Sequence, residues 1–145
     1  MSSTTADPNN PGNALATAVD EEVKKFQEMQ QQLQSLRGDF QVVMGQQTEN
    51  EMVQTELNML DSSGNIYKRA GPVLVRQELD DAKETVSKRL EFIQKEKEGI
   101  EKKMKDLEGK MDEKANKIQE MQANMQRMTA QAVQAIQQQH QASQG

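Results

Sequence analysis

The sequence predicts a mostly α-helical protein, in which two long helices pair as an antiparallel coiled coil on either side of a central β-hairpin. Apolar residues recur every three or four positions before and after the centre, as one stripe of a helix requires. The central residues 66–77, IYKRAGPVLVRQ, instead have the β-branched and aromatic residues of two short strands around a Gly-Pro turn. A compact hairpin lets the flanking helices fold back on each other.

Composition and charge exclude several classes of protein. Of 145 residues, 34% are hydrophobic, 3% aromatic and 28% charged, which is too little apolar material for a sizeable globular core. The net charge is −5 without a clustered basic face, so no nucleic-acid partner is expected. The sequence shows no signal peptide and no apolar run of membrane-spanning length, and we expect a cytoplasmic protein without a membrane partner.

Nothing in the sequence indicates catalysis. Cysteine is absent, and we find no phosphate-binding loop, catalytic triad or metal-ligand cluster. Tyr67 and His140 are the single tyrosine and histidine, and their positions favour a structural role over a chemical one. We therefore expect no enzyme, no cofactor and no metal site.

The N-terminal half divides into a leader and a helix. Residues 1–17 are rich in Ser, Thr, Asn, Pro and Gly and are expected to be disordered. A helix is predicted over 18–61, with acidic residues at its start that favour the positive end of the helix dipole. Its expected apolar stripe is Val19, Val23, Phe26, Leu33, Leu36, Phe40, Val43, Val53, Leu57 and Leu60.

The C-terminal half predicts a second helix over 78–136, with a nearly strict seven-residue repeat. Lys97 and Lys114 are the two polar residues of this repeat, and we interpret them as tuning helix register or oligomeric state. The uncharged, Gln-rich tail 137–145 is expected to fray. The positions of the repeat are Leu90, Ile93, Lys97, Ile100, Met104, Leu107, Met111, Lys114, Ile118, Met121, Met125, Met128, Ala132 and Ala135.

The hairpin region, residues 62–77, is predicted to be the assembly element. Successive strand residues point to opposite faces, so apolar side chains are expected on both faces of the hairpin. A lone two-stranded hairpin is marginally stable in water, and the sequence contains no other strand-like run. The missing strands are therefore expected from other chains. The residues assigned to subunit assembly are Ile66, Tyr67, Val73, Leu74 and Val75.

The stretch from Leu57 to Ile93 resembles a known family. Its segments GPVLVRQEL and ETVSKRLEFI are similar to prefoldin subunits of the β type, and most similar to subunit six of the eukaryotic complex. The resemblance covers roughly residues 19–128; the leader and the tail have no clear counterpart.

The resemblance implies a heterohexamer of two α-type and four β-type subunits, whose hairpins join intersubunit β-barrels and whose coiled coils hang from them. It also implies an ATP-independent co-chaperone that captures unfolded polypeptides, such as actin and tubulin, and delivers them to the cytosolic chaperonin.

Methionine suggests where clients would bind. Ten methionines are present, and unbranched, polarisable side chains suit surfaces that must fit many partners. We assign client binding at the far end of the helix pair to Val19, Val23, Met121, Met125 and Met128; alternatively, these residues merely close the coiled coil.

A rival function is a structural coiled-coil tether that binds one folded partner. The hairpin argues against a plain tether, because a simple zipper needs no β element between its helices.

Overall fold

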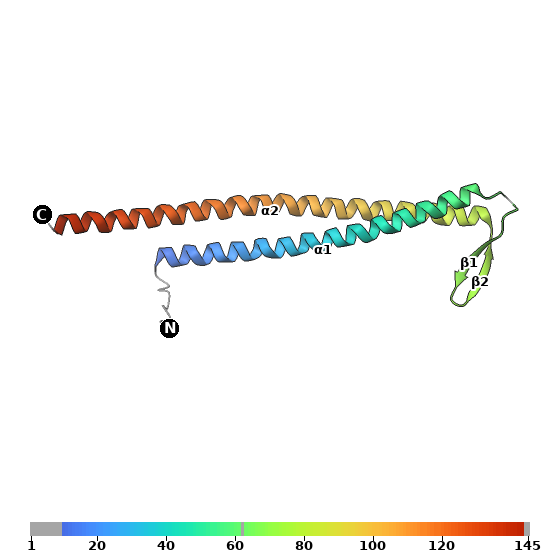
Figure 1. The fold of residues 1–145 in the computed structure, drawn as a ribbon, viewed down its shortest axis with the longest axis horizontal. Helices are drawn as coiled ribbons and strands as arrows, with labels where there is room; N and C mark the ends of the chain where they lie inside the picture. Colours follow the sequence, from blue (N-terminus) through green and yellow to red (C-terminus); the bar gives the residue numbers. More distant parts are fainter. Residues whose placement is uncertain (1–9, 62, 144–145) are drawn as a thin grey trace. The chain divides into compact units, whose positions relative to one another are not determined.

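The computed structural model describes residues 10–61 and 63–143 (Figure 1). The chain runs through α1 (Pro11–Met59), β1 (Ile66–Ala70), β2 (Val73–Gln77) and α2 (Leu79–Ser143). This confirms the expected mostly α fold with two long helices and a central hairpin. The chain forms two compact units: a hairpin unit, Gln34–Lys105, and a terminal unit of the residues up to Leu33 and from Asp106 onward.

Helix α1 begins at Pro11, whereas the sequence analysis placed its start at residue 18. Asn10 caps it: its side-chain Oδ1 accepts a hydrogen bond from the Gly12 amide at 3.0 Å, and its carbonyl accepts one from the Asn13 amide at 3.0 Å. Proline suits the first helical position, because its fixed φ is helical and its missing N–H is not needed there. The expected disordered leader is therefore helical from Pro11; residues 1–9 lie outside the described chain.

Helix α2 begins at Leu79 with Asp80 and Asp81 in its first turn, and it continues to Ser143. The expected frayed tail is thus helical as far as the structure describes it, with residues 144–145 beyond that range. The physical reason lies in the composition of this segment, since Gln and Ala are good helix formers and neither Gly nor Pro interrupts residues 132–143.

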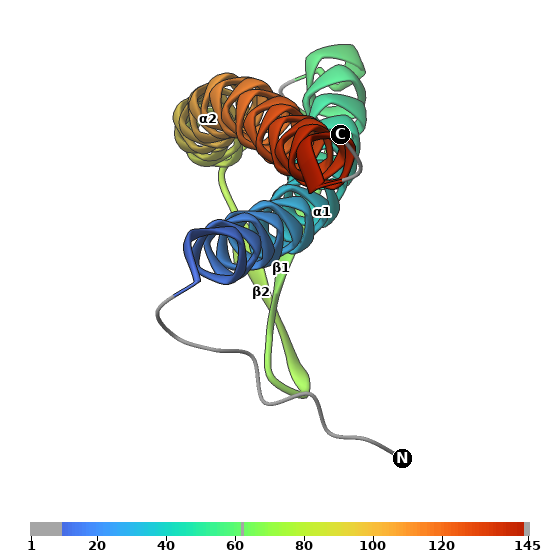
Figure 2. The same ribbon diagram turned by 90° about the vertical axis from the view of Figure 1, so that its left-hand side faces the viewer.

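Strands β1 and β2 lie side by side as a hairpin (Figure 2). They pair antiparallel, with Ile66 opposite Gln77 and Ala70 opposite Val73. Its two-residue turn consists of Gly71, with φ of +61°, and Pro72. A positive φ followed by the fixed negative φ of proline is the combination of a type II′ turn, whose twist matches that of the strands. The Gly71-Pro72 turn therefore sets the register of the whole hairpin.

The face of α1 that turns toward α2 follows a strict three-four spacing that differs from the expected stripe. Val53 and Leu60 were assigned to this face, but both are exposed, and Gln54 is half-buried in their place. The side chains of this face are, in order, Val19, Glu22, Phe26, Met29, Leu33, Leu36, Phe40, Val43, Gln47, Asn50, Gln54 and Leu57.

The predicted repeat of α2 is confirmed from Leu90 to Met125, where every position is buried or half-buried. In the hairpin unit, Leu57 packs with Ala82 and Val86, and Ile66 of β1 contacts this cluster. The hairpin is therefore anchored to the helices by its first residue. In the terminal unit, Val19 and Leu33 are the buried apolar residues of α1.

Candidate functional site

The hairpin exposes apolar side chains on both of its faces. Residues directly opposite each other share a face, so Val73 and Val75 project from one face and Tyr67 and Leu74 from the other. These four side chains are between 52% and 63% exposed. The sheet has two strands in the described part of the chain, so both of its edges can pair with further strands.

Ile66 differs from the other four residues assigned to assembly. It is half-buried and packs against the cluster around Leu57 within its own chain. The structure therefore brings Tyr67, Val73, Leu74 and Val75 together as an exposed set and gives Ile66 an anchoring position. The assembly role of these residues stays a prediction.

The residues assigned to client binding lie in the terminal unit, with graded exposure. Val19 is buried, Val23, Met121 and Met125 are half-buried, and Met128 is 38% exposed. Helix α1 extends back to Pro11, so residues of its first turns lie beside Met125 and Met128.

A shallow hollow of about 250 Å³ lies beside Met125 and Met128. Leu15 contributes to its lining and was missed by the sequence analysis, because the segment around it was expected to be disordered. The Asn10-Pro11 helix-start signal could have revealed it. The lining residues are Asn10, Pro11, Gly12, Leu15, Met125, Met128, Thr129 and Ala132.

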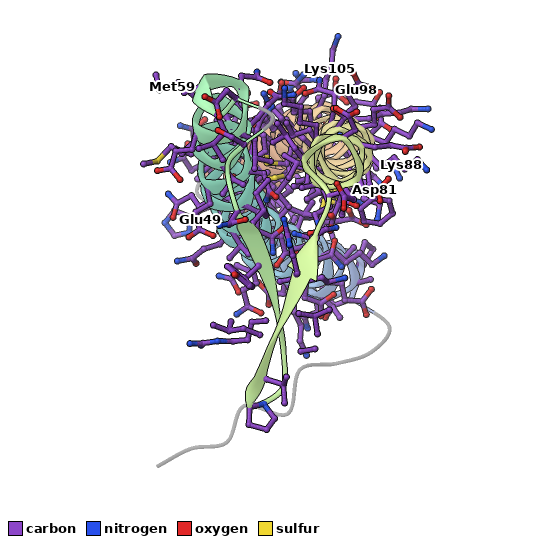
Figure 3. All side chains as sticks on the ribbon, turned by 90° about the vertical axis from the view of Figure 1, so that its right-hand side faces the viewer. Glu49, Met59, Asp81, Lys88, Glu98 and Lys105 are labelled. Atoms are coloured by element: carbon purple, nitrogen blue, oxygen red, sulfur yellow. The ribbon has the colours of Figure 1, made fainter. Side chains whose placement is uncertain are left out.

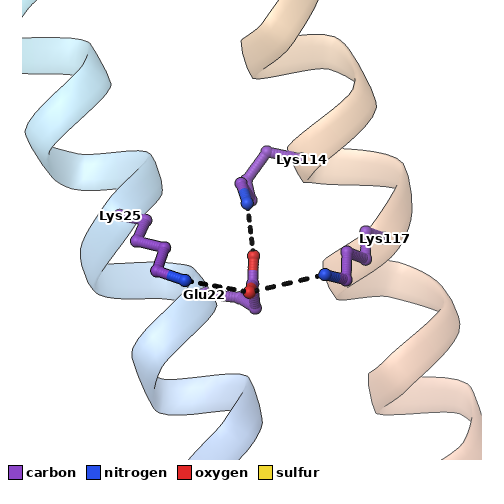
Figure 4. A network of polar contacts seen from close by, with 4 residues as sticks. All are labelled: Glu22, Lys25, Lys114 and Lys117. Carbon is purple, nitrogen blue, oxygen red and sulfur yellow. Dashed lines mark hydrogen bonds and ion pairs between the residues drawn. The ribbon is translucent and has the colours of Figure 1, made fainter.

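Glu22 lies on the inward face of α1 and is only 8% exposed (Figure 4). Its Oε2 pairs with the Lys114 ammonium at 2.6 Å, and its Oε1 with Lys117 at 3.5 Å and Lys25 at 3.6 Å. The hydrogen bond from Lys114 is the main reason that the pKa of Glu22 is lowered to about 2. Lys114 thus has a defined cross-helix partner, which fits its interpretation as a register residue.

Chemistry-bearing clusters are not found in the part of the chain that the structure describes. No three His, Cys, Asp or Glu side chains there are grouped so that they could hold a metal ion. Among the same residues, no helix combines the length and apolar character needed to cross a membrane. The candidate sites are therefore surfaces, one on the hairpin and one in the terminal unit.

Comparisons with known proteins bear on the family and the fold of the chain. The model of a family described as prefoldin subunit matches residues 20–131. Among solved structures, the chain is similar to the prefoldin beta subunit from Thermococcus strain KS-1, with 25% identity and a TM-score of 0.68. That alignment covers 71% of this chain and 90% of the other. A search of curated proteins finds no match. The finer resemblance to subunit six stays a prediction.

Proposed function

The chain belongs to the prefoldin family, and on that premise we propose that it is a β-type subunit of a heterohexamer with two α-type and four β-type subunits. The complex captures unfolded polypeptides, such as actin and tubulin, without ATP, and delivers them to the cytosolic chaperonin. It acts by holding clients, not by catalysis, and works in the cytoplasm.

One observation carries this proposal: the hairpin exposes Tyr67, Val73, Leu74 and Val75 on two faces and has unpaired edges. Strands added by other subunits would satisfy the backbone groups of these edges and cover the apolar side chains. An intersubunit β-barrel meets both requirements, because a closed sheet has no edge. A tether without partners at the hairpin would leave these side chains in water.

The terminal unit supplies the proposed client surface. Met125, Met128 and Leu15 contribute apolar side chains to the lining of a shallow hollow of about 250 Å³. Weak contacts of this kind gain strength when several subunits engage one unfolded chain together. Binding should therefore be broad in sequence and depend on the assembled complex.

The test uses the complex purified with its sibling subunits. Native mass spectrometry should give six subunits, and light scattering should show suppressed aggregation of two unrelated denatured proteins without ATP. A tether predicts otherwise: one native partner would co-purify, and neither denatured protein would be protected. That second outcome would refute the chaperone proposal.

A further inference from the structure

The last turns of α1 have their polar and apolar faces reversed. Toward α2 they present Gln47, Asn50 and Gln54, which are half-buried, before the apolar Leu57. Away from that face, four apolar residues between 52 and 60 are 40% to 79% exposed: Met52, Val53, Met59 and Leu60. Apolar surface that intrachain pairing would have used lies on the outside instead.

Three of these exposed residues lie in α1, and Leu60 follows directly after its last residue. Positions 52, 53, 56, 59 and 60 have the spacing of residues on one face of a helix, with Glu56 in the middle of the four apolar side chains. Figure 3 shows Met59 on the side of α1 that faces away from α2. We call the four apolar residues together with Glu56 the helix-end surface. An apolar stripe on an outer helix face is typical of a surface that a partner covers.

Charge indicates which partner fits. Glu56 lies within the helix-end surface, and Glu49, seven residues earlier, lies on the same side of α1; residues 47–61 contain no Lys or Arg. The hairpin, residues 66–77, contains three basic residues and no Asp or Glu: Lys68, Arg69 and Arg76. An acidic apolar helix end and a basic apolar hairpin are complementary in both respects.

We propose that the helix-end surface binds the hairpin of a neighbouring subunit whose chemistry is like that of this chain's own hairpin, apolar and basic. The inference rests on the proposed assembly of the hairpins and extends the subunit interface from the hairpin onto α1. The chain's own hairpin does not fill this role, because Met59 and Val73 are both left exposed within the chain. The helix-end surface is therefore covered only on assembly, by the hairpin of the neighbouring subunit.

The decisive variant changes Met52, Val53 and Met59 to Gln together. Glutamine retains helix propensity, so the isolated chain should keep its helical circular dichroism while losing the apolar contact. The reconstituted complex is then diluted and followed by native mass spectrometry. The variant should dissociate at a protein concentration at least about tenfold higher than the wild type does. The control changes Val133 and Ile136 of the terminal unit, two exposed apolar residues outside both proposed surfaces, to Gln, and should assemble as the wild type does.

A crosslinking experiment identifies the occupant. A photo-reactive benzoylphenylalanine at position 59 should crosslink, within the assembled complex, to the hairpin of a neighbouring subunit. Crosslinks that form only to a denatured client, or wild-type assembly of the triple Gln variant, would overturn the inference. The substitution Val73→Asp tests the proposed assembly through the hairpin separately, because it leaves the helix-end surface unchanged. If that variant assembles normally, the assembly proposal itself is wrong.

Discussion

The hairpin unit and the terminal unit each hold α1 against α2, yet they differ in what they leave exposed. In the terminal unit the inward face of α1 is apolar except for Glu22, and only Met128, Val133 and Ile136 are large, apolar and exposed among its described residues. In the hairpin unit the inward face includes three polar side chains, while the outer faces of helix and hairpin carry most of the exposed apolar groups.

This difference separates two uses of apolar residues. In the terminal unit they hold the chain's own helices together, and a buried ion pair fixes which residues meet. In the hairpin unit Leu57, Ala82 and Val86 do the same, but many of the other large apolar side chains are exposed, where another molecule can cover them. Apolar side chains gathered on an exposed face are typical of interaction surfaces. The comparison predicts that substitutions of exposed residues in the hairpin unit impair subunit assembly, whereas those in the terminal unit impair the protection of denatured proteins.

The largest effect is expected for Val73→Asp and Val75→Asp. Burying an unpaired carboxylate in an intersubunit sheet costs several kcal/mol, so hexamer formation should be lost. In the isolated chain both positions are exposed, so helical content should stay as in the wild type. Size-exclusion chromatography of the reconstituted complex measures the loss, with Val133→Asp of the terminal unit as control. Unchanged hexamer peaks for both hairpin variants would show that the exposed apolar residues of the hairpin are not needed for assembly.

Leucine substitutions sharpen the contrast between buried and outward positions. Leu57→Ala and Leu33→Ala, one in each unit, should each destabilise the isolated chain by about 2–5 kcal/mol, because both side chains are buried. Leu60→Ala should change its stability by less than about 0.5 kcal/mol, because Leu60 is exposed. Thermal melting followed by circular dichroism measures all three. Equal destabilisation by Leu57→Ala and Leu60→Ala would mean that the inward face is assigned wrongly.

Changing Met121, Met125 and Met128 to Ser should reduce protection of denatured proteins while hexamers still form. The reason is that these residues supply the apolar surface of the terminal unit, and the hairpin is untouched. Light scattering of two unrelated denatured proteins gives the readout. Met128→Ser alone removes only the exposed side chain and should lower protection without shifting the melting temperature. Full protection by both variants would show that the methionines only close the coiled coil.

The smallest effect is a pH dependence from Glu22. Its pKa falls from 4.5 to about 2 on folding, chiefly through Lys114, so the folded state favours the ionised form. The resulting stabilisation is fully present above about pH 4.5 and is lost as the pH falls toward 2. Glu22→Gln removes this contribution. Wild type and variant should therefore differ in melting temperature at pH 6, and the difference should shrink by pH 2.5.

Much of the fold could be predicted because its signals are local. The heptads of α2 and the Gly-Pro turn depend on residues close together in the sequence. The turn is confirmed, and the heptads are confirmed from Leu90 to Met125, whereas Met128, Ala132 and Ala135 are exposed. The inward face of α1 was harder to predict, because Glu22, Gln47 and Asn50 occupy positions where apolar residues are the usual signal. Val53 and Leu60 were assigned inward because they are apolar and lie four and three residues from Leu57, but this pattern cannot distinguish a contact within the chain from a contact with a partner.

The candidate sites were predictable to different degrees. The exposure of Tyr67, Val73, Leu74 and Val75 was predictable, because two apolar faces on one small hairpin are difficult to cover within the chain, whereas the packing of Ile66 was not. The contribution of Leu15 could not be predicted once its segment was taken as a leader. The partner of Lys114 was also missed, since pairing Glu22 with it requires the register of two helices whose contacting residues lie far apart in the sequence.

That separation has a kinetic consequence. The Gln47–Gln94 contact joins residues 47 apart, whereas Glu22 and Lys117 are 95 apart. Closing the longer loop from an unfolded chain costs about 0.6 kcal/mol more, since the loop is doubled. If the contacts nearest the hairpin form first, each later contact closes only a short additional loop. Folding should therefore proceed like a zipper from the hairpin outward, with hydrogen exchange slowest near Leu57 and fastest near Pro11.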